Sequence, residues 1–470
     1  MFILKKMMRK FHIFFAFLLC VFVVPSTQAQ NSGRIIKETL ISADADARLT
    51  NGNFTLSNNL QRIAYRVQEG KKNRVVVDSL PGNSYDSAGI PIFSADGNHF
   101  AYSAKDNNQS LLIIDHNQNQ LLEKGLSVYF MQFAPDNKNL VYILFNGQYY
   151  FMVFHGLRSK AYESIDESSI YFSADGSKIA YIASKDHKQA IVNNGVEGQW
   201  FNNVGCPVLS PDGKRLAYTA VNGKETILIT DDIVSRPYES ISDLQFNKDS
   251  KHYACVAKYR DQYVIIYDGH EGEMFPVIHS PLFSPDGNHF VYAMELKDGD
   301  EKTNGNYAIA DGGRLGPYST IVPASFKYNN DGTILLFNVL KDTKNSVMVN
   351  GIEKANYKNV ISGTAVFSPD NKHIAYIAEK SDAKQIANID GVESKQYDAV
   401  YAVTFSPNSS KYAYSVKEGN HAFVVVDGKA GNSYDALLGS GFVLFNSENA
   451  FHYIVLKDKK IYLIEERFQP

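Results

Sequence analysis

Cysteine is scarce in this chain. Only three of its 470 residues are cysteines, and one of them, Cys20, lies in the apolar N-terminal stretch, which leaves Cys206 and Cys255. Two cysteines cannot supply the disulfide framework of a small secreted domain, although they allow a single bridge. We expect both to be buried thiols.

Long apolar runs are missing after residue 24. The one that exists, Phe11 to Val24, follows four basic residues and precedes Ser26-Thr27-Gln28-Ala29. This is the layout of a secretory signal peptide over residues 1–29, cleaved after Ala29. A lipid anchor at Cys20 is disfavoured because Leu19 stands where a small residue is needed. We therefore expect an exported product, periplasmic or secreted, with no membrane span in the mature chain.

The chain also lacks a block of one charge sign. Its formal charge is −3, and the expected leader carries four positive charges and no acidic residue, so the mature chain has about −7. Such a mild acidic surplus gives no electrostatic footprint for nucleic acid. The Gly-x-Ser-x-Gly motif of serine hydrolases is absent too.

What the chain does have is an internal repeat. An anchor residue, usually Ser, follows a large apolar residue and precedes Asp, Asn or Glu by two positions, often in the form Phe-Ser-Pro-Asp-Gly. Seven and eight residues after the anchor comes Ala-Tyr or a similar pair in the first ten copies. Most anchors are 37 to 40 residues apart, with one step of 45. The anchors are Ser57, Ser94, Ala134, Ser173, Ser210, Asn247, Ser284, Asn329, Ser368, Ser406 and Asn446.

A second block follows each of the first ten anchors. It begins with Asp, Asn or His, usually before Gly, and in nine copies an aromatic stands seven residues later, as in Asp427 and Tyr434. Ser-Pro-Asp-Gly and Asp-Gly both favour tight turns, because Gly accepts a positive φ and Asp bonds the local backbone. The segments between the turns are apolar on both faces, which indicates sheets covered on both sides.

Four antiparallel strands in each repeat of about 40 residues are typical of a propeller blade. The sequence thus predicts an all-β propeller of about eleven four-stranded blades. Because four to eight blades usually close a ring, we favour two rings over one large ring, with repeats over 53–245 and 246–470. The segment 30–52 contains RIIKETLIS, which is expected to pair with the C-terminal strands, since the last repeat lacks its fourth strand.

The stretch Phe283 to Tyr292, FSPDGNHFVY, resembles the "PD" class of WD-like propeller repeats found in TolB-like proteins and in the propellers of some peptidases. The resemblance covers nearly the whole mature chain. It implies a β-propeller that serves as a binding platform or an envelope assembly factor. The extra α/β domain of TolB has no counterpart here, so its partner contacts are not carried over.

Several residues are candidates for chemistry, and each has a simpler interpretation. His99, His252, His289 and His373 all stand five residues after an anchor, which places them in different blades and argues against a shared metal. Asp298, Asp300 and Glu301 lack the remaining ligands of a calcium loop, and Trp200 is expected to pack at a blade edge instead of stacking on a sugar. We predict no catalytic residue, no metal ligand and no cofactor.

We therefore expect a non-enzymatic binding or scaffold propeller of the bacterial cell envelope, with a protein or another envelope component as partner and a carbohydrate as the alternative ligand. The alternative is a propeller enzyme, such as a polysaccharide lyase or glycosidase, whose site lies in a ring funnel and draws on loops of several blades. Irregular residues gathered at one mouth of the ring would favour the enzyme, whereas smooth repetition would favour the scaffold.

Overall fold

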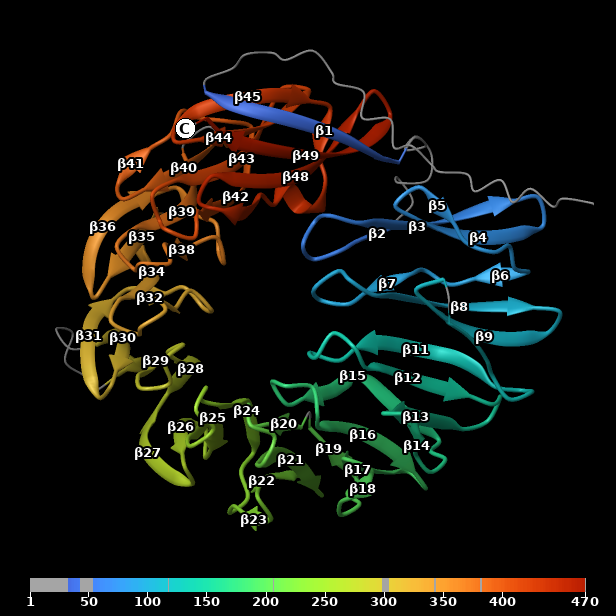
Figure 1. The fold of residues 1–470 in the computed structure, drawn as a ribbon. Coiled ribbons are helices and arrows are strands. Elements are labelled where there is room, and N and C mark those ends of the chain that lie inside the picture. The colour runs from blue at the N-terminus through green and yellow to red at the C-terminus, as the bar shows by residue number, and fades with distance from the viewer. Residues whose placement is uncertain are drawn as a thin grey trace, which may run out of the picture.

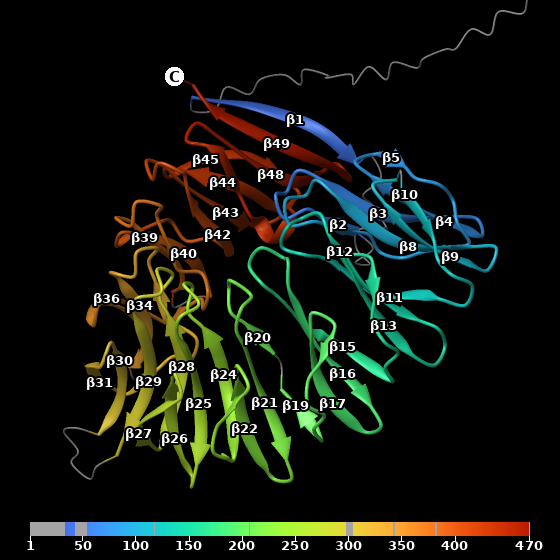
Figure 2. The same ribbon diagram turned by 60° about the horizontal axis from the view of Figure 1, so that its bottom comes forward.

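Eleven sheets stand side by side around one ring in the computed structural model (Figures 1 and 2). The structure describes residues 33–42, 54–116, 118–205, 207–297, 304–341, 344–380 and 383–469. The expected signal peptide, Cys206, Asp298, Asp300 and Glu301 lie outside the described residues. In Figure 1 the blades over residues 164–197, 240–275 and 277–318 run from a first strand toward the middle of the ring to a last strand toward the outside.

The strands follow the predicted repeat. Blades 1 to 4 consist of β2 (Phe54–Leu56), β3 (Ile63–Glu69), β4 (Lys72–Val77) and β5 (Leu80–Pro81); β6 (Ser87–Ala88), β7 (Ile92–Phe93), β8 (Phe100–Asp106), β9 (Gln109–Ile114) and β10 (Gln118–Leu121); β11 (Ser127–Phe133), β12 (Leu140–Phe145), β13 (Tyr150–Phe154) and β14 (Leu157–Arg158); and β15 (Ser164–Phe172), β16 (Ile179–Lys185), β17 (Lys188–Asn193) and β18 (Val196–Glu197).

Blades 5 to 8 consist of β19 (Asn203–Val204), β20 (Val208–Leu209), β21 (Leu216–Asn222), β22 (Glu225–Thr230) and β23 (Ile233–Val234); β24 (Ser240–Phe246), β25 (Tyr253–Tyr259), β26 (Gln262–Tyr267) and β27 (His270–Phe275); β28 (Val277–Phe283), β29 (Phe290–Leu296), β30 (Gly305–Ala310) and β31 (Gly313–Tyr318); and β32 (Thr320–Ile321), β33 (Lys327–Tyr328), β34 (Leu335–Lys341), β35 (Lys344–Val349) and β36 (Ile352–Tyr357).

Blades 9 to 11 consist of β37 (Asn359–Val360), β38 (Val366–Phe367), β39 (Ile374–Glu379), β40 (Gln385–Ile389) and β41 (Val392–Glu393); β42 (Ala399–Phe405), β43 (Tyr412–Glu418), β44 (His421–Val426) and β45 (Lys429–Tyr434); and β46 (Ala436–Leu437), β47 (Leu444–Ser447), β48 (Ala450–Lys457), β49 (Lys460–Phe468) and the N-terminal β1 (Arg34–Ser42). The only helical element among the described residues is the short 3-10 turn η1 (Gly439–Gly441).

The core lies between neighbouring sheets. At the first interface, Ala64 and Val75 of blade 1 pack with Phe100, Tyr102 and Ile113 of blade 2, and all five side chains are buried. The small Ala leaves room for the large ring opposite, which is how two sheets pack face to face at close spacing. The Ala-Tyr pair of the repeat therefore serves blade stacking.

The two ends of the chain close the last blade, as predicted. Strand β1 pairs antiparallel with β49, from Arg34 opposite Phe468 to Ser42 opposite Ile461. Blade 11 then packs on blade 1 through a cluster that includes Ile454, Ile461, Ile63 and Tyr65. The eleven blades therefore form one closed ring.

The preference for two rings was wrong. Residue 245 lies within β24, whose blade packs on blade 5 through Leu228 and Cys255 and on blade 7 through Val256 and Met294. The repeat reveals how many blades there are, but the angle between blades is set by the packing of their faces. The sequence pattern does not display that angle.

Candidate functional site

The Ser-Pro-Asp-Gly turns carry a dense set of hydrogen bonds. In blade 2, Ser94 Oγ donates to Asp96 Oδ1 at 2.6 Å, and the same carboxylate oxygen accepts from the backbone N–H of Asn98 at 3.0 Å. The backbone N–H of His99 donates to Ser94 Oγ, and Gly97 has a φ of +74°. These bonds within the motif stabilise its turn.

Electrostatics in these turns follow from the same bonds. The hydroxyl of Ser173 lowers the pKa of Asp175 to about 2, and the hydroxyl of Ser210 does the same for Asp212. Hydrogen bonds to the ionised carboxylate stabilise the charged form. These aspartates are therefore charged at neutral pH and act as turn acceptors.

The second recurrent turn of the repeat is hydrogen-bonded to the start of the strand that follows the first turn. The residue just before that strand, five positions after the anchor, stands at what we call the clamp position. The Asp, Asn or His of the second turn adopts a positive φ near +50° in each of the first ten blades, which explains why these residue types recur there. In blade 2, Asp115 Oδ1 accepts from the backbone N–H of Phe100, while Oδ2 pairs with His99 Nδ1 at 2.6 Å. The pairs His252–Asp268, His289–Asp311 and His373–Asp390 repeat this contact.

The four candidate histidines consequently lie in four blades, namely 2, 6, 7 and 9, as their register indicated. The structure also places each beside an aspartate of its own blade. They are half-buried clamp residues. Among the described residues, no group of three His, Cys, Asp or Glu side chains is arranged to hold a metal.

In blades 1 and 5 an arginine stands at the clamp position and reaches the next blade. Arg62 Nε donates to Asp78 Oδ2 at 2.7 Å, and its Nη1 donates to the carbonyl oxygens of Gly97 and Asn98 at 3.1 and 3.0 Å. Its guanidinium carbon lies 5.3 Å from the centre of the Phe93 ring. A guanidinium therefore joins a carboxylate, two carbonyls and an aromatic ring across the blade interface.

Arg215 makes the same set of contacts. Its Nε donates to Asp231 Oδ2 at 2.7 Å, and Nη1 donates to the carbonyl oxygens of Ser250 and Lys251 at 3.4 and 2.7 Å. The ring of Phe246 lies 5.1 Å from its guanidinium carbon. The arrangement is thus a repeated feature of the blade interface.

A pocket opens at the corresponding place between blades 7 and 8. Its volume is about 380 Å³, and His289, Asp311, Tyr328, Gly332 and Thr333 are among the residues that line it. His289 Nδ1 lies 2.7 Å from Asp311 Oδ2, and the imidazole stacks on the Tyr328 ring. The hydroxyl of Tyr328 is buried and has no hydrogen-bond partner among the described residues, and burial raises its pKa.

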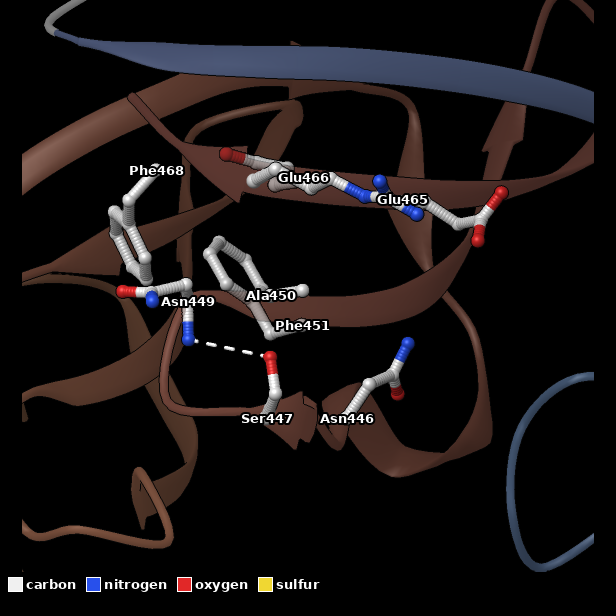
Figure 3. A pocket seen from close by; sticks show the side chains of 9 residues that line it. Asn446, Ser447, Asn449, Ala450, Phe451, Glu465, Glu466 and Phe468 are labelled. Carbon is white, nitrogen blue, oxygen red and sulfur yellow. Dashed lines mark hydrogen bonds between the residues drawn. The ribbon is translucent and has the colours of Figure 1, made fainter. Parts of the chain in front are cut away.

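A second pocket lies at the closing blade (Figure 3). Its volume is about 350 Å³, and Asn446, Phe451, Glu466 and Phe468 are part of its lining. Glu466 is fully buried, and burial raises the pKa of its carboxyl. The carboxyl oxygens already face Arg34 at 3.1 Å and the Tyr453 hydroxyl at 2.6 Å. We therefore assign Glu466 to ring closure.

The outer edge of the ring carries a row of exposed aliphatic side chains, which we call the rim. Each follows the Asp-Gly-type turn and is the first residue of the outermost strand in its blade, with 60 to 77% of its surface exposed. The rim consists of Leu80, Leu157, Val196, Ile233, Ile352 and Val392. The outermost strands β14, β18 and β23 follow one another along the periphery in Figure 1.

Charges beside the rim are paired between blades. Arg236 holds Glu271 of the next blade with two hydrogen bonds, and Lys160 pairs with Glu197 at 3.1 Å. The rim therefore combines exposed apolar side chains with charges of both signs.

The innermost strands show a different irregularity. Tyr129 of β11, Tyr171 of β15 and Tyr401 of β42 are each well exposed, as is Phe442 just after η1. A Cβ atom on Gly441 would lie 2.8 Å from the Cβ of Tyr401, so the absence of a side chain at Gly441 lets η1 pack closely on Tyr401. No position of the repeat predicts these exposed rings.

No family model and no curated protein matches the chain. Solved structures that resemble it include a eukaryotic initiation factor (12% identity, 72% of this chain and 96% of that one, TM-score 0.39). An oligogalacturonate lyase in complex with manganese (12%, 68% and 98%, 0.28) and the β-propeller domain of the Trilobed protease from Pyrococcus furiosus (16%, 56% and 96%, 0.28) also resemble it. The chain is a β-propeller, and its own eleven sheets carry that assignment.

Trp200 and Cys255, the other described residues considered from the sequence, both take part in packing between blades. Trp200 packs against the buried cluster between blades 3 and 4, with its ring 6.5 Å from that of Tyr162. Cys255 is a buried free thiol. No helix in the described part of the chain is long and apolar enough to span a membrane.

Sequence reasoning missed the pocket between blades 7 and 8. One signal was available, because Tyr328 is the only tyrosine at the position before the anchor, where the other copies have Phe or Leu. Arg62 and Arg215 stand at the position that His289 occupies in blade 7. Only their contacts in the structure show that a guanidinium would fill the place of this pocket.

Proposed function

We propose that this chain is an exported, non-enzymatic binding propeller of the bacterial cell envelope and that its partner is a protein. The single observation that carries the proposal is the rim, whose exposed aliphatic side chains recur at one position of the blade. The resemblance of the repeat to the PD class supports a binding role. The N-terminal leader pattern over residues 1–29 supports export.

A protein partner fits the rim better than a small ligand does. Leu157, Val196 and Ile233 belong to three consecutive blades, so they form an extended convex row and enclose no volume. Small molecules bind in concave sites that cover most of their surface. An extended apolar row with paired charges beside it suits a second polypeptide surface.

The test is site-specific photocrosslinking. A benzophenone amino acid replaces Val196 or Ile233, and a matched control carries it at Asn98, an exposed residue of a turn. We expect one defined protein to crosslink at both rim positions and not at Asn98, and the triple variant Leu157→Ser, Val196→Ser, Ile233→Ser to lose it. Equal labelling at all three positions, or no crosslinked protein, would contradict a rim partner.

The second candidate is an enzyme that acts on a polysaccharide. Tyr129, Tyr171 and Tyr401 on the inner strands, and Phe442 just after η1, are exposed and favour it, because aromatic rings can stack on sugars. Incubation with a panel of polysaccharides decides between the two proposals. Turnover that is lost in Tyr401→Ala would favour the enzyme over the scaffold.

A further inference from the structure

The pocket between blades 7 and 8 occupies the place that a guanidinium fills at two other blade interfaces. Gly332 and Thr333 stand three and four residues after their anchor, as do Gly97 and Asn98, whose carbonyls accept from Arg62. Ser250 and Lys251, which accept from Arg215, have the same register. Blade 7 has His289 at the clamp position in place of arginine.

Histidine satisfies only part of this arrangement. Its Nδ1 reaches Asp311 Oδ2, as the arginine Nε does in blades 1 and 5, but the ring then stacks on Tyr328 and no atom of it bonds to the next turn. Within the described residues, the carbonyl of Gly332 accepts no hydrogen bond, and that of Thr333 has only a long contact of 3.5 Å from Asn350. The space beside them is the pocket of about 380 Å³.

The groups around this space suit a cation with several N–H donors. Asp311 is half exposed to the pocket mouth, and Asp286 lies close to Gly332, where a Cβ atom would be 2.6 Å from its Oδ1. The buried Tyr328 hydroxyl, to which no described residue is hydrogen-bonded, is also part of this interface. Carboxylates and carbonyls in one place accept hydrogen bonds, and the planar fork of a guanidinium supplies donors in that geometry.

We propose that this pocket binds the guanidinium group of an arginine side chain presented by a protein partner. The ligand chemistry comes from the pocket itself, whereas the protein source of the arginine rests on the proposed function. The partner's guanidinium takes the place that Arg62 and Arg215 take in blades 1 and 5, with Asp311 and the carbonyls of Gly332 and Thr333 as acceptors.

The key variant is His289→Arg, which gives blade 7 its own guanidinium. The probe is N-acetyl-arginine methylamide, titrated against the purified protein and followed by NMR. We expect saturable binding to the unmodified protein and a loss of about tenfold or more in His289→Arg, because the variant fills the pocket. The matched control His373→Arg alters the same position in blade 9 and should bind the probe as the unmodified protein does.

A second variant covers the case in which His289→Arg folds poorly. Asp311→Asn keeps the shape of the clamp and removes its charge, so we expect a loss of about tenfold, whereas Asp390→Asn in blade 9 should have no effect on the probe. The neutral citrulline analogue should not bind. Unchanged binding in both His289→Arg and Asp311→Asn would overturn the assignment, as would equal binding of the citrulline analogue or of the lysine analogue.

Three further outcomes separate this inference from the proposed function. Free arginine that binds more tightly than the blocked residue would overturn the protein source and leave the guanidinium site in place. If a protein crosslinks to the rim and His289→Arg affects neither its capture nor the probe, the inference fails while the proposed function stands. If His289→Arg no longer binds the probe and no protein crosslinks to the rim, the inference stands and the proposed function fails.

Discussion

Replacing Arg34 by methionine tests how the ring is closed. Arg34 on β1 faces Glu466 on β49 at 3.1 Å, and both side chains are almost completely buried. Removing one partner of such a pair leaves a buried charge without compensation, which typically lowers the free energy of unfolding by about 3–5 kcal/mol. At pH 8 we expect the free energy of unfolding of Arg34→Met to fall by this amount. We also expect the amides of β1 and β49 to exchange faster in this variant.

The sign of the pH dependence gives a second signature. Burial already raises the pKa of Glu466 above its ordinary value, with Arg34 opposing that shift. Without Arg34 the pKa rises further, so the folded state holds a proton that the unfolded state releases near its ordinary pKa. Stability is then lost as the pH rises through the folded pKa, and Arg34→Met should be more stable at pH 5 than at pH 8.

The assay is hydrogen exchange of the β1 and β49 amides together with denaturant unfolding. The matched control is Lys37→Met, because Lys37 pairs with Glu465 at 2.5 Å on the same two strands but is more than half exposed. An exposed pair contributes less than about 1 kcal/mol. Equal effects of the two variants, or a pH-independent loss in Arg34→Met, would refute the reasoning.

Three further predictions concern the packing of the blades. The thiol of Cys255 should not react with a thiol reagent at pH 8 until the protein is unfolded, because burial raises its pKa to about 12; reaction in the folded state would contradict this. Gly332→Ala should lower the melting temperature more than Gly391→Ala. Both glycines have a positive φ, but only at Gly332 would the new Cβ lie 2.6 Å from a carboxylate oxygen and an imidazole carbon. An equal loss of about 1 kcal/mol in both variants would exclude the clash. Burial lowers the pKa of His116 and His279, so their contribution to stability is present above about pH 6.5 and lost as the pH falls below it. Melting curves of a variant with glutamine at both positions should depend less on pH between 7 and 5 than those of the unmodified protein.

Much of the fold could be predicted because the repeat encodes local geometry. Residues such as Asp96 and Gly97 determine a turn by their own bonds and φ angles, and Ala64 with Tyr102 determines a face that must be covered. The pairing of β1 with the C-terminal strands followed from a missing strand in the last repeat. These features depend on short stretches of sequence.

The number of rings and the pocket could not be predicted in this way. Ring size depends on small packing angles accumulated over eleven interfaces, and no single residue records them. The pocket between blades 7 and 8 exists because the His289 side chain does not reach the carbonyl oxygens of Gly332 and Thr333 in the next blade. The aliphatic rim was visible in the sequence as Leu, Val or Ile after the turn, but its exposure depends on the outermost strand having no neighbour.

Electron cryomicroscopy of the purified protein tests the central claim most directly. We expect particle images and a reconstruction with eleven four-stranded sheets around a single ring, in which β1 lies against β49 and blade 11 contacts blade 1. Two smaller rings in one chain, or a ring left open between blades 11 and 1, would contradict the account.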